Sequence, residues 1–356
     1  MEIQITQCSP EQCKRKPSGS ENLGFGRSFT DHFFLQNYTP ERGWHRPRVE
    51  PYRTLSLDPA TMVLHYGQQV FEGMKAYRGK DGVFLFRHRD NFRRLNRSCR
   101  RLVIPELNPE VLEQGLIALL RIDQDWIPHS SEGTLYIRPT VIATDPVLGV
   151  RPSDTYLFYA IAGPAGSYYA EGFNPVQIYV SDDYVRAVSG GIGEAKTAGN
   201  YAASLAAQQE AKKKGYAQVL WLDGQSRQFV EEVGTMNIFF RIQDELITSP
   251  LTGSILPGIT RDSVIQIARS WGVKVVERML SMDEVLEASS SGQLREVFGT
   301  GTAAVIAPIN RFHFKGKEIQ VGDGKTGELS AKLYHYILDL QYGRIEDPFG
   351  WRTQIL

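Results

Sequence analysis

One lysine lies in an unusually small and apolar stretch of the chain. The segment SGGIGEAKTAGNYAAS (189–204) surrounds Lys196 with Gly and Ala, just before a predicted helix. Burial in such surroundings disfavours the ammonium form of a lysine, and the neutral amine that remains can attack an aldehyde. A lysine on a flexible surface loop is the alternative, and this stretch taken alone favours it.

Two neighbouring glutamates could supply a carboxylate to such chemistry. Glu231 and Glu232 lie in a predicted strand over 228–233. Because alternate residues of a strand point to opposite faces, only one of the two can face the core side. An inward carboxylate beneath a pyridine ring would keep the ring nitrogen protonated, so that the ring accepts electrons. A solvated strand end is the alternative for this pair by itself.

Three stretches could bind an anion such as phosphate. LPGIT (256–260) presents backbone N–H groups at a predicted helix N-terminus, and FGTGT (298–302) is a Gly/Thr turn of the same kind. The stretch RHRDNFRRLNRSCRR (87–101) holds seven arginines. Most of them are expected on a solvated face, but one turned inward could hold a phosphate through two parallel hydrogen bonds.

Strands and helices are predicted throughout the chain. The periodic pattern indicates strands at 83–86, 134–143, 155–162, 176–181, 218–222, 228–233, 236–242 and 294–300, and helices at 90–101, 109–121, 200–214, 261–271, 281–284 onward and 328–341. Gly and Pro interrupt every pattern near 166–175, which indicates a linker. We therefore expect an α/β fold with a loose N-terminal arm (1–20), a smaller α/β domain (21–165), the linker (166–175) and a larger α/β domain (176–356) that carries Lys196.

Composition excludes several classes of function. Lys+Arg and Asp+Glu both number 40, so the zero formal charge gives no electrostatic case for nucleic acid or an anionic membrane as partner. No apolar run approaches the roughly 18 residues of a membrane-spanning helix, and residues 1–20 contain no signal-like stretch. The three cysteines, Cys8, Cys13 and Cys99, make neither a disulfide framework nor a metal set. We expect a cytoplasmic protein without a metal site.

The order of the motifs resembles that of the branched-chain aminotransferases, a branch of the fold-type IV enzymes that use pyridoxal 5′-phosphate (PLP). The resemblance runs from FGRSFTDH (25–32) to LQYGR (340–344), through HYGQQVFEGMKAYRG (65–79), LYIRPT (135–140), GEAKTAGNYAASL (193–205), QVLWLDG (218–224), EVGTMNIFF (232–240), LPGITRD (256–262) and FGTGTAA (298–304). It implies a two-domain, D-amino-acid-aminotransferase-like fold with PLP in the interdomain cleft. It also implies reversible, ping-pong transamination between L-leucine, L-isoleucine or L-valine and 2-oxoglutarate.

The resemblance further implies roles for individual residues. Lys196 would carry the cofactor and move the proton, Glu232 would pair with the pyridine nitrogen, and Tyr201 with the 3′ oxygen. The implied cofactor-binding residues, of which Arg94, Ile259, Thr260 and Thr302 take the phosphate, are Arg94, Lys196, Tyr201, Glu232, Thr235, Ile259, Thr260 and Thr302. The implied substrate-binding residues are Phe25, Tyr66, Phe71, Tyr136, Arg138, Val150, Tyr168, Thr235, Thr302 and Ala303.

Three of these residues have a more specific implied role. Tyr66 would receive the substrate carboxylate together with the backbone of Thr302 and Ala303, and Arg138 would hold Tyr66 and help admit the second carboxylate of glutamate. Val150 would reach the pocket of the neighbouring subunit, which implies a homodimer.

Two alternatives remain open at this point. A D-amino-acid aminotransferase or an aminodeoxychorismate lyase would share the lysine and the glutamate, but LYIRPT and FEGMKAYRG favour the branched-chain branch. A non-catalytic, Gly-rich phosphate-binding module would give Lys196 no role, and its protein would be colourless. The chain departs from mammalian members of the family, which carry a Cys-x-x-Cys redox pair where Ala304 and Ala307 stand here.

Overall fold

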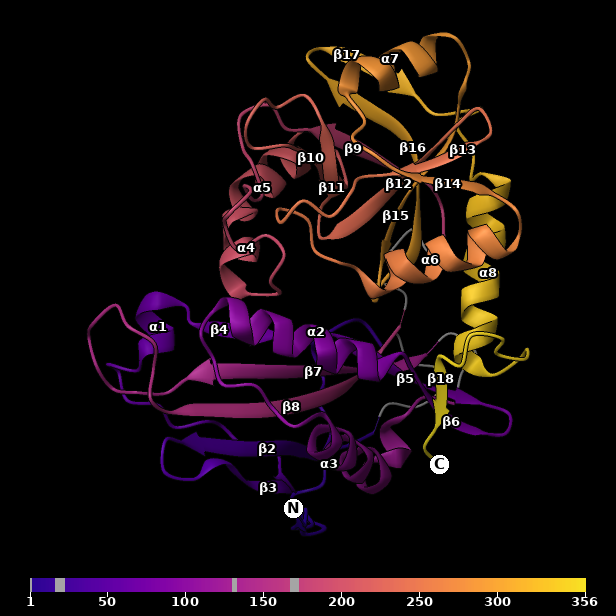
Figure 1. Ribbon diagram of the computed structural model, residues 1–356. Coiled ribbons are helices and arrows are strands. Elements are labelled where there is room, and N and C mark those ends of the chain that lie inside the picture. The colour runs from indigo at the N-terminus through magenta and orange to yellow at the C-terminus, as the bar shows by residue number, and fades with distance from the viewer. Residues whose placement is uncertain (1, 17–22, 130–132, 167–172) are drawn as a thin grey trace. The chain divides into compact units, whose positions relative to one another are not determined.

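The structure, a computed structural model, describes residues 2–16, 23–129, 133–166 and 173–356. The chain divides into two compact units (Figure 1). Unit 1 consists of Met1–Tyr168, Ala195–Ala198 and Asp339–Leu356, and unit 2 of Tyr169–Glu194 and Gly199–Leu338. Most of the predicted linker 166–175 lies outside the described residues.

This division departs from the predicted domain boundaries at two places. Lys196 belongs to unit 1 rather than to the C-terminal domain, and so does the C-terminal segment 339–356. The physical reason is long-range pairing: the C-terminal strand β18 (Arg352–Gln354) pairs with β6 (Gly82–Phe86). Local composition does not reveal such pairing.

A single sheet forms the base of unit 1. Its strands in spatial order are β1 (Gln4–Ile5), β3 (Gly43–Pro51), β2 (His32–Thr39), β8 (Tyr156–Ala165), β7 (Thr134–Ala143), β5 (Met74–Gly79), β6 and β18, and β4 (Gln69–Phe71) pairs with β7. The neighbours pair antiparallel, apart from the parallel pair β1–β3. Strand β1 corrects the expectation of a loose arm, because the backbone of residues 4–5 finds hydrogen-bonding partners at the edge strand β3.

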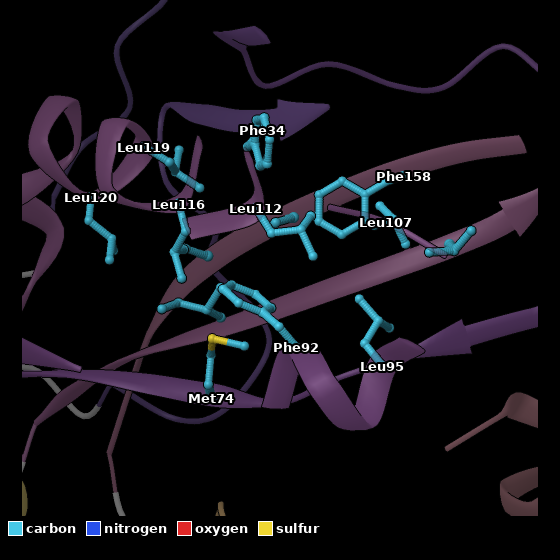
Figure 2. Packing of buried hydrophobic residues seen from close by; sticks show 14 of the residues in the cluster. Phe34, Met74, Phe92, Leu95, Leu107, Leu112, Leu116, Leu119, Leu120 and Phe158 are labelled. Carbon is cyan, nitrogen blue, oxygen red and sulfur yellow. The ribbon is translucent and has the colours of Figure 1, made fainter. Parts of the chain in front are cut away.

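Helices α2 (His88–Arg101) and α3 (Pro109–Ile122) pack in unit 1 together with the short elements α1 (Met62–Tyr66) and η1 (Gln124–Trp126). Figure 2 shows Phe92 of α2 and Leu112 and Leu116 of α3 gathered with Phe34 and Phe158 of the sheet. Helix α3 lies very close to the sheet, since a Cβ added at Gly115 would be 2.1 Å from the ring of Phe34.

In unit 2 the strands close into a ring. The spatial order is β11 (Val230–Val233), β10 (Gln218–Leu222), β9 (Val176–Val180), β16 (Val305–Phe314), β15 (Leu294–Gly301), β12 (Met236–Ile242), β13 (Glu245–Thr248) and β14 (Lys274–Glu277), with β17 (Lys317–Gln320) on β16. Because β11 also pairs with β12, the path from β11 through β10, β9, β16 and β15 to β12 returns to its start. Apolar side chains such as Leu220, Ile238 and Phe312 form the core of this unit.

The remaining helices are α4 (Ala198–Ala203), α5 (Leu205–Lys213), α6 (Ile259–Ser270), α7 (Met282–Ser290) and α8 (Glu328–Tyr342). The predicted single helix over 200–214 is wrong, because the chain breaks at Ser204, whose hydroxyl donates to the Tyr201 carbonyl at 2.7 Å. Within the described part of the chain, no helix has the length and apolar character needed to cross a membrane.

Candidate active site

The backbone of Lys196 is held by two elements of unit 1. Its N–H donates to the Ser98 hydroxyl of α2 at 2.9 Å, and its carbonyl accepts from the Phe71 N–H of β4 at 3.0 Å. The Lys196 Nζ lies 4.9 Å from the centroid of the Phe71 ring. The side chain is half-buried rather than buried as predicted. The fold thus fixes where this side chain starts while leaving its amine within reach of a ligand.

A buried ion pair lies on the same elements. Arg94, on α2, meets Glu72 through Nε–Oε1 at 2.7 Å and Nη2–Oε2 at 2.8 Å, and the two side chains are 4% and 0% exposed. Asn91 also donates to Glu72, at 2.8 Å. Burial alone would raise the pKa of Glu72, but the charge and hydrogen bonds of Arg94, followed by the charge of Lys196, hold it below its ordinary value. Of the adjacent arginines, Arg94 is therefore the inward one, while Arg93 is 69% exposed.

Aromatic side chains surround Arg138 in unit 1. Its guanidinium lies 4.7 Å from the Phe71 ring centroid and 5.3 Å from that of Tyr136, and its Nη2 donates to the Tyr136 hydroxyl at 2.9 Å. Phe25 packs edge-on against Tyr136, with 4.8 Å between ring centroids. We call Phe25, Phe71, Tyr136 and Arg138 the aromatic cluster. The expected partner of Arg138 was Tyr66, and this is corrected: its hydrogen bond goes to Tyr136, two residues away on the same face of β7.

The other predicted substrate residues of unit 1 lie apart from that cluster. Tyr66 ends α1 and is 41% exposed. Val150 lies in the loop between β7 and β8 and is 90% exposed. Tyr168 lies outside the described residues.

Glu232 occupies a buried polar position in unit 2. Its Oε2 lies 2.6 Å from Arg186 Nη2, and its Oε1 accepts from Asn237 Nδ2 at 2.9 Å. Asn237 faces Glu232 across the β11–β12 ladder and also donates to the Leu256 carbonyl at 2.8 Å. Two donors therefore keep this carboxylate ionised and fixed in position.

Glu231 is buried as well, which corrects the expectation that only one glutamate of the pair faces inward. It points to the opposite face of β11, where the Ser254 hydroxyl donates to its Oε1 at 2.5 Å. Its Oε2 has no hydrogen-bond partner in the described structure, and burial raises its pKa. Both faces of β11 are covered, so burial alone does not separate the two glutamates; their partners do.

A pocket in unit 2 brings several predicted cofactor residues together. Tyr201 of α4, Glu232 of β11 and Thr235 of the turn after β11 all line it. The lining consists of Arg186, Asn200, Tyr201, Ser204, Glu232, Gly234, Thr235 and Leu256. A buried carboxylate and a phenol on one wall suit a flat heteroaromatic ring that carries a nitrogen and a hydroxyl.

The two predicted anion-binding turns are also in unit 2. Ile259 and Thr260 form the first turn of α6, whose N-cap Gly258 offers no side-chain hydrogen bond. A Cβ at Gly258 would lie 1.9 Å from Asn237 Oδ1, so only glycine lets the turn approach the partner of Glu232. Thr302 and Ala303 lie half-buried in the turn between β15 and β16. A helix N-terminus of this kind presents backbone N–H groups to an anion.

With this geometry established, comparison with known proteins decides the family. The model of the amino-transferase class IV family matches residues 69–312. The chain belongs to the class IV aminotransferases.

Relatives of this aminotransferase agree over nearly its whole length. Branched-chain-amino-acid transaminase 1 of Bacillus subtilis (strain 168) is 53% identical over 344 residues, which are 96% of each chain. The crystal structure of the Escherichia coli branched-chain amino acid aminotransferase is 30% identical, with a TM-score of 0.76 over 92% of this chain and 99% of that one. The branched-chain aminotransferase of the thermophilic archaeon Thermoproteus uzoniensis, solved with norvaline, is 26% identical, with a TM-score of 0.74 over 91% and 100%.

A further solved structure bears on the cofactor. It is a bacterial-length branched-chain amino acid aminotransferase in complex with pyridoxamine 5′-phosphate, and it is 27% identical to this chain, with a TM-score of 0.75 over 91% of this chain and 98% of that one. The predicted family and its fold-type IV, α/β architecture are confirmed.

Three residues of this aminotransferase were missed by the sequence reasoning. Glu72, Arg186 and Asn237 hold Arg94 and Glu232 in place, but none was singled out. Glu72 carried a usable signal, because it is a lone acid inside the apolar stretch QVFEGM. Arg186 and Asn237 carried none, since nothing local distinguishes them from surface residues.

Proposed function

We propose that this aminotransferase transfers amino groups between L-leucine, L-isoleucine or L-valine and 2-oxoglutarate, giving branched-chain 2-oxo acids and L-glutamate. PLP is its cofactor. The observation that carries the proposal is the aromatic cluster, which combines apolar walls with the cation of Arg138. The names of the Bacillus subtilis and Escherichia coli relatives support the same substrate class.

The described residues fit PLP. Glu232, buried and held by Arg186 and Asn237, suits the ring nitrogen, and Tyr201 in the same pocket suits the 3′ oxygen. Phosphate contacts are assigned to Arg94, Ile259, Thr260 and Thr302, with Thr235 close to the ring pocket. When bound, PLP supplies an aldehyde that takes up the amino group and a ring that accepts electrons from the substrate.

Lys196 is assigned the attachment of the cofactor and the movement of a proton at the substrate α-carbon. Its backbone is fixed by Ser98 and Phe71, so the amine sweeps only the volume that its own rotamers allow. A positioned amine that alternates between base and acid is the usual means of moving such a proton. The nearby Glu72 carboxylate balances the charge of Arg94 and Lys196.

Substrate choice is assigned to the aromatic cluster. Apolar walls stabilise a branched aliphatic side chain by about 0.8 kcal/mol for each buried methylene. L-leucine and L-isoleucine should therefore react clearly better than L-alanine, and modestly better than L-valine. A second carboxylate, as in glutamate, cannot be buried there without a partner. Arg138 and the Tyr136 hydroxyl are the groups available in this cluster.

Arg138→Met should slow the glutamate half-reaction more than the leucine half-reaction. A hydrogen bond to a charged group contributes about 1.5–3 kcal/mol, so the difference should be roughly tenfold to a hundredfold. Single-turnover absorbance of the cofactor measures each half-reaction separately. Arg78→Met is the matched control, because Arg78 donates to the backbone of Ile127 and Gln124 and not to the aromatic cluster.

The same measurements decide between the proposal and its rivals. Equal losses for glutamate and leucine in Arg138→Met would remove Arg138 from recognition of the second carboxylate. Faster turnover of D-alanine than of L-leucine by the unaltered enzyme would overturn the branched-chain assignment and favour a D-amino-acid aminotransferase.

Arg94→Ala should weaken PLP binding by about 1–3 kcal/mol, the contribution of a charge-assisted hydrogen bond to phosphate. Arg93→Ala is the control, because Arg93 is largely exposed and pairs with Asp90 at the surface. Equilibrium titration of cofactor-free protein with PLP measures both affinities. Equal affinities would assign the phosphate contact to another residue. Because the Ala variant also strands the buried Glu72, Arg94→Lys should recover part of the affinity by retaining the charge.

A homodimer is proposed from the loop between β7 and β8. Val150 and Leu148 of this loop are 90% and 66% exposed, which is unfavourable for apolar side chains unless a partner covers them. Sedimentation should show a dimer, and Val150→Asp should weaken it and slow leucine turnover. Leu251→Asp, at another exposed leucine, is the control. A fully active monomer would contradict the assignment. Cytoplasmic location also remains a proposal, which cell fractionation would test.

A further inference from the structure

Two cysteine side chains near the N-terminus lie in contact. The Cys8 and Cys13 sulfur atoms are 2.7 Å apart, with Cys8 half-buried and Cys13 exposed. From the sequence, these were expected to be unrelated residues of a loose arm. The structure instead places them at the two ends of a turn, in which the Cys13 N–H donates to the Ser9 carbonyl at 3.2 Å.

The Cys8 end of the turn is anchored to a buried polar pair. The Cys8 N–H donates to His32 Nε2 at 2.9 Å, so the proton of the neutral ring lies on Nδ1. That nitrogen meets Asp123 Oδ1 at 2.7 Å, and the His32 backbone N–H donates to Asp123 Oδ2 at 3.0 Å. Cys8 is therefore tied to a rigid position at the start of β2.

The Cys13 end is anchored to the neighbouring residue of the same strand start. The Lys14 N–H donates to Asp31 Oδ1 at 2.8 Å, and the Trp126 indole donates to Asp31 Oδ2, also at 2.8 Å. Lys14 Nζ additionally donates to the Thr30 carbonyl at 2.8 Å. Because both ends are bound to adjacent residues of the core, the approach of the two sulfurs is imposed by the fold.

We propose that Cys8 and Cys13 are a reversible redox pair that forms a disulfide by exchange with a low-molecular-weight disulfide. The exposed Cys13 thiolate attacks one sulfur of that disulfide and expels one thiolate. The Cys8 thiolate then attacks the Cys13 sulfur of the mixed disulfide and expels the second. Two protons pass to solvent, the two protein thiols are oxidised, and the small disulfide is reduced to two thiols.

The order of attack follows from the surroundings of the two thiols. Burial, and then the neighbouring Cys13, raise the pKa of Cys8 to about 11, so little of it is thiolate before the mixed disulfide forms. Cys99 is fully buried, and burial raises its pKa to about 12. It should take no part in exchange, which makes it the internal control.

A metal site is the competing use of this cluster, because Asp31 brings a carboxylate close to the two sulfurs. Two thiolates bound to one zinc at about 2.3 Å in a tetrahedron are roughly 3.8 Å apart. The observed 2.7 Å is much shorter, and Asp31 already accepts hydrogen bonds from Lys14 and Trp126. The geometry therefore favours the disulfide.

The test is exposure of the full-length holoenzyme to oxidised glutathione, followed by alkylation of free thiols and peptide mass spectrometry. Wild type and Cys99→Ser should lose two hydrogen masses through a Cys8–Cys13 link, and reduced glutathione should reverse it. Cys8→Ser should instead retain a glutathione adduct on Cys13. In wild type this adduct should resolve at least about tenfold faster, since the second thiol is present at millimolar effective concentration.

Three outcomes would overturn the proposal. One is a stable glutathione adduct on wild-type Cys13, and another is a link that includes Cys99. The third is protection of both thiols by added Zn²⁺ alone, at one ion per chain and without any disulfide after its removal in oxidised glutathione.

Discussion

Replacing Lys196 with alanine should abolish nearly all transamination, by at least about 10²–10⁴-fold, because no base then remains to move the substrate proton. The variant should still bind PLP through its phosphate, since Arg94 and the first turn of α6 are untouched. Amino-acid turnover and PLP titration together measure these two effects. Borohydride reduction of the unaltered holoenzyme should leave the pyridoxyl group covalently attached to Lys196.

Lys75 makes this mapping a stringent test. It lies on β5, is buried, and burial lowers its pKa to about 8, so it has more neutral amine than an ordinary lysine. Lys212, on the exposed side of α5, serves as a surface control. A pyridoxyl group mapped to Lys75 or Lys212 would overturn the assignment of Lys196, and a colourless holoprotein would favour a phosphate-binding module without catalysis.

Glu232→Gln should reduce turnover by roughly 10²–10³-fold, the effect of removing one preorganised electrostatic partner. A neutral amide cannot hold the pyridine nitrogen in its protonated form, and it also leaves Arg186 without its carboxylate. The absorption spectrum of the bound cofactor and the rate of the leucine half-reaction report the change. Glu231→Gln is the matched control, because Glu231 is adjacent, also buried, and on the opposite face of β11. Equal losses in both variants would reject the special role of Glu232.

The control variant also carries a pH dependence. Burial raises the folded-state pKa of Glu231 above its unfolded value, so its contribution to stability is present at acidic pH and is lost as pH rises through the folded pKa. Glu231→Gln should therefore gain stability relative to wild type as pH rises from acidic to neutral. Thermal unfolding at both pH values measures this.

The β-strand pattern of unit 1 shows how far local periodicity reaches. Strands β7 and β8 are predicted close to their observed bounds, because each is a long apolar run between turn residues. Strand β3 is not predicted, since its sequence GWHRPRVEP is polar and contains Pro47. The register against β2 shifts there, and Arg46 has a φ of 52°, so a β-bulge absorbs the proline and the strand continues. Only the pairing with β2 reveals it.

The sequence by itself determined the family and its chemistry, because Lys196, Glu232 and the phosphate-binding turns lie in short contiguous motifs whose order is readable along the chain. Tertiary structure alone decided which neighbours give these residues their properties. Glu72 turns Arg94 inward, Arg186 holds Glu232, and the covered outer face of β11 gives Glu231 an environment unlike that of Glu232. The physical reason is that charge and hydrogen bonding act between side chains close in space, whereas periodicity records only which face of one element is buried.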